Sequence, residues 1–167
     1  FNREANLDLR STRYLGDDAR FEVRLRYDEI KSAQLLFDGI EGSRSRVDLG
    51  YRWTGIGHSL AVRLGLEDND RLDPGVSPSR QRIQATYGYQ VTDHWVLEST
   101  AYFRISDYDD LALPRTEDLF SVSLQVAYET GSNWQFSGRY QYSNNDSSDP
   151  IYSYDRNVLT IGFQRLF

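Results

Sequence analysis

Residues 21–27 read FEVRLRY, and this stretch alternates strictly between two kinds of side chain. One set is apolar and the other is charged: Phe21, Val23, Leu25 and Tyr27 against Glu22, Arg24 and Arg26. Successive side chains of a β-strand point to opposite faces of its sheet. The stretch therefore predicts a β-strand with one apolar face and one charged face.

The same alternation recurs on both sides of this stretch, whereas helical periodicity is nearly absent. A weaker run precedes it at residues 7–10. Further runs follow at residues 47–53, 60–67, 82–91, 97–105, 120–129, 134–142 and 158–167. The sequence therefore predicts an all-β chain of nine strands.

The connections between these runs alternate in length. Short turns are expected at residues 16–18, 54–58, 92–94 and 130–133, and long polar loops at roughly 28–44, 68–80, 106–118 and 143–155. Strands of about ten residues joined in this way are typical of an antiparallel up-and-down transmembrane β-barrel. We expect about 8–10 strands, with the short turns in the periplasm and the long loops outside the cell.

A soluble β-sandwich or lipocalin-like barrel also has alternating strands, so aromatic placement helps to separate the classes. Membrane barrels carry aromatic girdles at both lipid interfaces. Six aromatic residues lie beside the expected short turns: Tyr14, Trp53, Tyr89, Trp95, Tyr128 and Trp134. Others lie near the long loops: Phe103, Phe120, Tyr142, Tyr152 and Tyr154. The placement favours the membrane barrel.

The composition is compatible with one barrel domain over residues 1–167. We also expect that this domain can be the carboxyl-terminal part of a longer chain. The 19 basic and 25 acidic side chains argue against a general nucleic-acid partner. There is no cysteine, and so no disulfide or thiolate metal site. Because no apolar run approaches the roughly 18 residues of a membrane helix, a helical membrane protein is excluded.

The last residues, RNVLTIGFQRLF at 156–167, end an alternating strand with phenylalanine. Leu159, Ile161, Phe163 and Phe167 share one face. This ending resembles the carboxyl-terminal signature of Gram-negative outer-membrane β-barrel proteins. The resemblance implies a location in the bacterial outer membrane, contact with its lipid and lipopolysaccharide, and recognition by the barrel-assembly machinery. Arg165 departs from the family pattern, in which the third residue from the end is usually apolar or tyrosine.

A narrower resemblance covers about a sixth of the chain. The stretch YQYSNNDSSDPIYSYDRNVLTIGFQRLF, residues 140–167, is similar to the final hairpin of barrels that follow tetratricopeptide repeats. These include the surface lipoprotein assembly modifiers and related polysaccharide-export barrels. The resemblance implies periplasmic or export partners.

The number of strands raises a question about completeness. Bacterial single-chain barrels have an even number of strands with both ends in the periplasm. Nine strands therefore imply a miscount or at least one upstream strand. The apolar segment QLLFDGI, residues 34–40, is compatible with an extra strand, with a constriction loop inside the barrel, or with an extracellular extension.

The charged face defines the candidate functional residues. Those expected to line the lumen are Arg24, Arg26, Arg52, Arg63, Arg82, Arg104 and Arg139, with Glu22, Asp48, Glu67, Glu98 and Glu129. Buried charges must pair or face water. In a narrow barrel they would interlock as a closed core, typical of an anchor or assembly factor. In a wider barrel the arginines would line a pore or export conduit that favours anions. A third hypothesis is a barrel that binds ligands through its long loops.

Enzymatic function is not expected, and neither is a cofactor. The two histidines, His58 and His94, fall in expected periplasmic turns, away from any wall or rim where a Ser-His or Asp-His pair would act. Acids in the loops, such as Asp68, Asp70 and Asp107, are interpreted as solvated rather than as metal ligands. No phosphate loop, Rossmann pattern or zinc spacing occurs.

Overall fold

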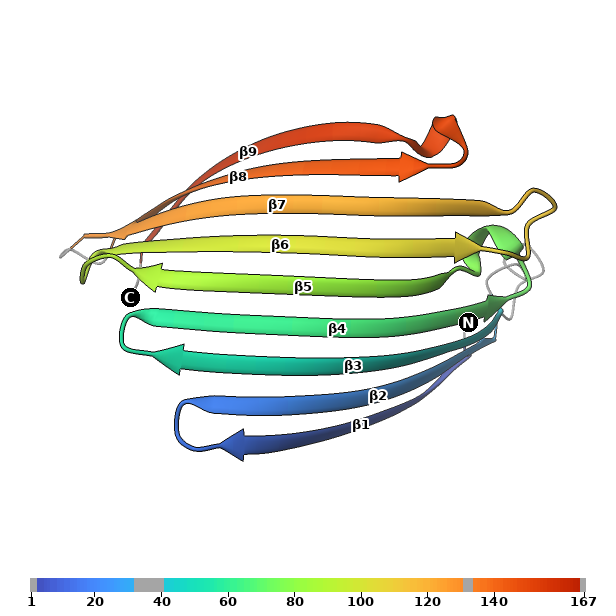
Figure 1. Ribbon diagram of the computed structural model, residues 1–167, viewed down its shortest axis with the longest axis horizontal. Coiled ribbons are helices and arrows are strands. Elements are labelled where there is room, and N and C mark those ends of the chain that lie inside the picture. Colours follow the sequence, from blue (N-terminus) through green and yellow to red (C-terminus); the bar gives the residue numbers. More distant parts are fainter. Residues whose placement is uncertain (1–2, 32–40, 131–133, 166–167) are drawn as a thin grey trace.

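The computed structural model describes residues 3–31, 41–130 and 134–165, and these form one antiparallel sheet of nine strands (Figure 1). The strands are β1 (Arg3–Leu15), β2 (Ala19–Lys31), β3 (Gly42–Gly55), β4 (His58–Arg71), β5 (Ser79–Gln90), β6 (Trp95–Tyr108), β7 (Arg115–Glu129), β8 (Trp134–Ser147) and β9 (Tyr154–Arg165). Each strand pairs with its neighbours in sequence, in the order β1 to β9. The expected up-and-down all-β fold is therefore confirmed.

The strands are longer than the sequence suggested, because polar residues continue the pairing at the long-loop end. Residues 28–44 were expected to be loop, yet β2 extends to Lys31 and β3 begins at Gly42. Asp28 pairs in register with Arg44, and the Arg44 Nε donates to Asp28 Oδ2 at 2.9 Å. The loop boundaries expected from polarity were wrong, since a charged residue extends a strand when its cross-strand neighbour has the opposite charge.

The short turns depend on residues that suit tight connections. Gly16 and Gly57 have φ angles of 75° and 72°, a left-handed conformation that glycine adopts without strain. In the turn between β5 and β6, Thr92 Oγ1 accepts hydrogen bonds from the backbone N–H groups of His94 and Trp95, each at 3.2 Å. These turns keep successive hairpins in register.

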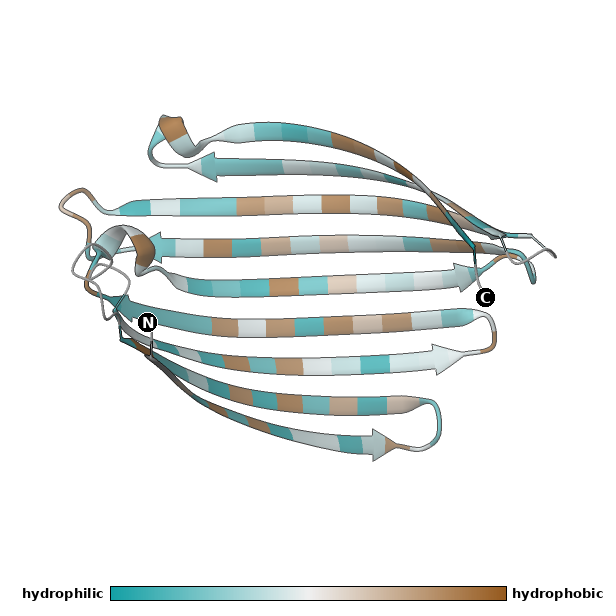
Figure 2. Ribbon diagram, turned by 180° about the vertical axis from the view of Figure 1, so that it is seen from behind, coloured by the Kyte–Doolittle hydropathy of each residue, from teal (hydrophilic) through white to brown (hydrophobic). Residues whose placement is uncertain are grey.

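The described strands enclose almost no hydrophobic core. Among the described residues, the buried apolar side chains are those of Tyr108, at 7% exposure, and Pro78, which follows a loop. Leu159, Ile161 and Phe163 are 71%, 80% and 75% exposed. Figure 2 shows apolar and polar residues alternating along the strands. A soluble sandwich would bury this apolar face, so its exposure is not that of a soluble fold.

The sheet is curved and open. Figure 1 shows the outer strands β1, β2, β8 and β9 curling away from the plane of the central strands. β1 and β9 are the two edges of the sheet order and are not paired with each other. With nine antiparallel strands, these two edges run in the same direction, as the strand count implied. The segment 34–40 lies outside the described residues. Within the described ranges, no helix is long and apolar enough to cross a membrane.

Two of the long connections share a sequence pattern. NDRLDPGVS, residues 69–77, and NDSSDPIYS, residues 145–153, both follow N-D-x-x-D-P-x-x-S. Each forms a short 3-10 helix, η2 (Pro74–Val76) and η3 (Pro150–Tyr152). In both loops, the aspartate before the proline caps the 3-10 helix. Asp73 Oδ1 accepts a hydrogen bond from Gly75 N at 2.8 Å, and Asp149 Oδ1 accepts one from Ile151 N at 3.1 Å. We call these the two DPxxS loops.

The asparagine that opens each loop donates to a carbonyl beside the loop serine, but on opposite sides of it. Asn69 Nδ2 donates to the carbonyl of Pro78, which follows Ser77, at 2.9 Å, and Asn145 Nδ2 donates to the carbonyl of Tyr152, which precedes Ser153, at 2.7 Å. The serine that ends each loop accepts a hydrogen bond from the last residue of the preceding strand, at 2.9 Å for Ser77 and 3.0 Å for Ser153. The hairpins β4–β5 and β8–β9 are thus closed by the same device.

Candidate functional site

The candidate site is the polar face of the sheet, and the strand register assembles it. Along one row, Arg24 pairs with Asp48, Asp48 with Gly65, Gly65 with Arg82, and Arg82 with Arg104. Directly paired residues of an antiparallel sheet lie on the same face. The register places every charged residue expected in the lumen on this polar face: Glu22, Arg24, Arg26, Asp48, Arg52, Arg63, Glu67, Arg82, Glu98, Arg104, Glu129 and Arg139.

An ion-pair cluster occupies the centre of β3, β4 and β5. Asp48 accepts from Arg82 Nη2 at 2.6 Å and from Arg46 Nε at 2.9 Å. Glu67 Oε1 lies 3.0 Å from Arg80 Nη1. The side chains of Asp48 and Glu67 are only 11% and 8% exposed. These acids are therefore fully engaged and act as the structural centre of the face.

Gly65 explains how Arg82 reaches Asp48 across an intervening strand. A Cβ at Gly65 would lie 2.9 Å from Asp48 Oδ1 and would collide with the Arg82 side chain. Only a residue without a side chain leaves room for this crossing. The central ion pair thus depends on a glycine that carries no charge itself.

The charges of β1 and β2 are paired in a similar way. Arg24 Nε donates to Asp8 Oδ1 at 2.8 Å, and Arg10 Nη2 donates to Glu22 Oε2 at 2.9 Å. Arg20 lies 3.1 Å from the other oxygen of Glu22. The part of the face that runs from β1 to β5 therefore has most of its charge compensated.

Other arginines of the polar face have no acidic partner within 4.0 Å among the described residues. They are Arg52, Arg63, Arg104, Arg139 and Arg156. The buried Nε of Arg104 makes no hydrogen bond within this part of the chain. Glu98 and Glu129 are likewise without an ion pair there, and Glu98 lies in the same row as Arg139, with Gln125 between them. Five arginines without an acidic partner against two acids without a basic one leave the polar face with an excess of positive charge.

Two hollows lie on the polar face and share Gln84. The first has a volume of about 260 Å³ and includes Arg52 and Arg63 in its wall. The second has a volume of about 450 Å³ and extends over β5 to β9. Most of its wall is uncharged and polar: Gln84, Thr100, Tyr102, Ser121, Ser123, Gln141, Ser143 and Tyr154, with Leu119, Val158, Arg139 and Arg156. We call this second hollow the β5–β9 groove.

Sequence reasoning did not identify the groove, although the signal was present. Tyr154 was expected in the outer aromatic girdle, but it pairs with Asn145 and lines the groove instead. Because Leu159 was placed on the apolar face of the last strand, its neighbour Val158 falls on the polar face. Counting back from it in steps of two reaches Arg156 and Tyr154, so alternation alone assigns both to the polar face.

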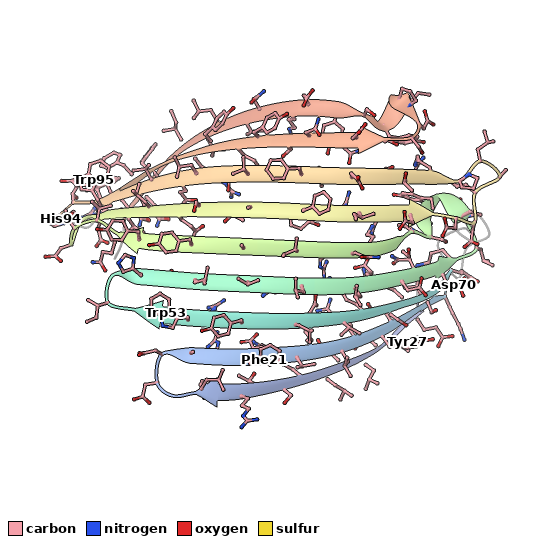
Figure 3. All side chains as sticks on the ribbon, viewed as in Figure 1. Phe21, Tyr27, Trp53, Asp70, His94 and Trp95 are labelled. Atoms are coloured by element: carbon pink, nitrogen blue, oxygen red, sulfur yellow. The ribbon has the colours of Figure 1, made fainter. Side chains whose placement is uncertain are left out.

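Five of the six aromatic residues expected beside the short turns share the apolar face there. Trp95 packs on Tyr128 with ring centroids 4.6 Å apart, and Figure 3 shows Trp53 and Trp95 toward the short-turn end, opposite Asp70. Tyr89 and Trp134 lie on the same face by register. Tyr14 is a correction, because it pairs with Arg20 on the polar face.

The histidines pack on aromatic rings near the short turns. His58 stacks on Tyr89 with ring centroids 4.7 Å apart, and the rings of His94 and Tyr128 are arranged edge to face with centroids 6.1 Å apart. These contacts belong to different hairpins. No group of three or more histidine, cysteine or acidic residues is arranged to hold a metal ion within the part of the chain that the structure describes.

The last strand carries the residues of the expected insertion signal. Leu159, Ile161 and Phe163 lie on the apolar face of β9, where their pairing with β8 places them beside other apolar side chains. Phe167 lies outside the described residues. The structure thus supports the shared face of three of the four residues.

Comparison with known proteins identifies the fold. No protein-family model matches the chain, and no curated protein matches its sequence. The structure is similar to that of OmpT, an outer membrane protein of Vibrio cholerae, with a TM-score of 0.74 and 15% sequence identity. The match covers 96% of this chain and 55% of that one, so the chain spans about half the length of the similar structure. The fold is therefore that of an outer-membrane β-barrel.

Proposed function

We propose that this chain forms part of the wall of a β-barrel in the bacterial outer membrane and that its polar face lines a passage for small anionic solutes. The observation that carries the proposal is the inside-out arrangement of the sheet. Its apolar face is exposed, whereas its charged face holds nearly buried acids and a set of arginines that have no acidic partner among the described residues. Lipid suits the first face and water suits the second.

The strand dimensions fit a membrane. The strands contain 12–15 residues. At 3.3 Å per residue, 12 residues extend about 40 Å, and a tilt near 45° reduces the height to about 28 Å. This height covers the apolar band of about 25 Å that outer-membrane barrels present to lipid. The aromatic residues beside the short turns then lie at one interface.

The unpaired arginines support anion preference. Arg52 and Arg63 lie side by side on the wall of the smaller hollow without an ion pair in the described residues. Fixed positive charge at a water-filled constriction raises the local concentration of anions and lowers that of cations.

The proposal also names the partners of the barrel. Lipid and lipopolysaccharide would surround it, and the barrel-assembly machinery would recognise β9 during insertion. A periplasmic export partner would bind at the periplasmic end.

Ion selectivity in planar bilayers tests this function. The protein is inserted into the bilayer and the reversal potential is measured in a KCl gradient. We expect chloride preference, and we expect the double variant Arg52→Glu/Arg63→Glu to shift selectivity several-fold toward potassium. Arg52→Lys/Arg63→Lys keeps the charge and should keep chloride preference. Channels that are indifferent to both double variants would contradict the proposal.

One observation favours a second candidate, a closed anchor or assembly factor. The compensated ion pairs of β1 to β5 are the arrangement expected in a lumen filled by its own side chains. An anchor would insert and fold without conductance. Electrical silence of a correctly folded barrel would therefore select this candidate over the passage.

A further inference from the structure

We propose that the β5–β9 groove binds a carboxylated saccharide. The inference rests on the proposed function in one respect, since the polar face must be open to water. It goes beyond ion preference, because it assigns a binding site to one part of the face and a chemical class to its ligand. The chemistry of the groove wall, its charge and its length each contribute to the assignment.

The floor of the groove is a set of hydrogen-bonding groups held in place by one another. Gln141 Nε2 donates to Ser121 Oγ at 3.1 Å and to Ser143 Oγ at 3.2 Å. Ser143 Oγ donates to Ser121 Oγ at 2.9 Å. Both amide hydrogens of Gln141 are therefore used, while its carbonyl oxygen makes no hydrogen bond within the described residues. This carbonyl is a pre-positioned acceptor for a ligand hydroxyl.

The charge of the groove is positive and uncompensated. In the part of the chain described, the Arg139 side chain makes one hydrogen bond, from Nη2 to Ser123 Oγ at 3.2 Å, and Arg156 has neither an ion pair nor a hydrogen bond. The groove wall contains two arginines and no acid. A guanidinium pairs well with a planar carboxylate, to which it can donate two parallel hydrogen bonds. The ligand is thus expected to be anionic.

The spacing of the arginines favours an extended ligand over a single small ion. Arg139 pairs with Thr160, and Arg156 lies four residues earlier on β9. Four residues of strand extend roughly 13 Å. The intervening wall offers hydroxyls, amides and the rings of Tyr102 and Tyr154. Such rings pack against the C–H faces of sugars while the polar groups meet their hydroxyls.

Binding to the full chain, folded in detergent micelles, tests the assignment. Isothermal titration with trigalacturonate is compared with maltotriose, a neutral trisaccharide, and with sodium sulfate. We expect trigalacturonate to bind at least tenfold more tightly than either. Arg139→Gln/Arg156→Gln should weaken its binding at least tenfold. Arg13→Gln is the matched control, since Arg13 pairs with Phe21 on the apolar face, and it should leave the affinity unchanged.

Each other result overturns the inference. Equal affinity for maltotriose would remove the requirement for charge, equal affinity for sulfate would reduce the site to a simple anion site, and absence of trigalacturonate binding would remove the site. The comparison of the three ligands on the native chain tests the inference even if the double variant does not fold. Because micelle binding does not require conduction, loss of this site leaves a chloride-selective channel intact, and a silent channel leaves the binding result intact.

Discussion

Asp48 holds arginines from two strands, and its loss should destabilise the sheet. Asp48→Asn keeps the size of the side chain but removes the charge that pairs with Arg46 and Arg82. The two guanidinium groups would then keep only Glu67 Oε2 as a shared acidic partner, at 3.8 Å from Arg46 and 3.9 Å from Arg82. We expect the free energy of unfolding to fall by about 2 kcal/mol. Urea unfolding of the barrel in phospholipid vesicles, followed by tryptophan fluorescence, measures the change.

Glu98 provides the matched control for Asp48. It lies on the same face, yet it has no ion pair among the described residues. Glu98→Gln removes the same charge and should change the free energy of unfolding by less than about 0.5 kcal/mol. If the two variants lost the same stability, net charge rather than the central cluster would control folding.

For single residues, the sequence predicted the face of the sheet on which a side chain lies better than it predicted the residues that the side chain contacts. Alternation placed Glu22, Asp48 and Arg82 on the polar face, because the period of a strand is fixed by its backbone. It could not predict that Arg82 reaches Asp48 across β4. That contact depends on the register and on Gly65, which exposes no charge to reveal its role. Tyr14 was misplaced because nearness to a turn does not determine a face.

The two DPxxS loops should stabilise their hairpins through the capping aspartates. Asp149→Ala removes the acceptor for Ile151 N in the loop between β8 and β9. Loss of a side-chain cap costs about 1 kcal/mol. We expect that decrease in vesicles, together with faster amide hydrogen exchange at Ile151 and Tyr152.

Asp146 is the control within the same loop pattern, since its side chain makes no hydrogen bond in the described ranges. Asp146→Ala should leave both stability and exchange nearly unchanged. Faster exchange in the Asp146 variant equal to that of Asp149→Ala would mean that loop charge, not capping, holds the hairpin together.

The elements themselves could be predicted in number and order but not in length. Residues 28–30 and 42–44 were expected in a loop because most of this region is polar, yet they pair across β2 and β3. Strand ends are determined by cross-strand partners that are distant in sequence, and no local pattern contains them. The repeat of the DPxxS loops, in contrast, is visible in the sequence and marks two equivalent hairpins.

The whole molecule is defined by which face meets which solvent. A soluble sheet protein buries its apolar face, whereas this sheet leaves it exposed and partly buries its charges. The alternation predicted two faces of opposite character. The alternation alone could not decide which of the two faces points outward, because soluble β-proteins and membrane β-barrels share this pattern. Aromatic placement and the character of the last strand supplied that information.

Adjacent substitutions on β5 test this orientation directly. Ile83 lies on the apolar face in the middle row of the sheet, paired with Leu64 and Phe103. Ile83→Arg would place a charge among lipid chains near the bilayer midplane, at a cost of about 2–4 kcal/mol. Gln84→Arg places the same charge one residue away on the polar face, where water is available, and should cost less than about 1 kcal/mol.

The measurement is urea unfolding of both variants and the native chain in the same vesicles. The difference in unfolding free energy between the two variants is the decisive quantity. Both variants introduce an arginine into β5, so the strand propensity of arginine cancels in this difference. We expect Ile83→Arg to unfold at clearly lower urea than Gln84→Arg. Equal stabilities, or a larger loss for Gln84→Arg, would mean that the apolar face does not lie in lipid, and the passage along the polar face would fail with it.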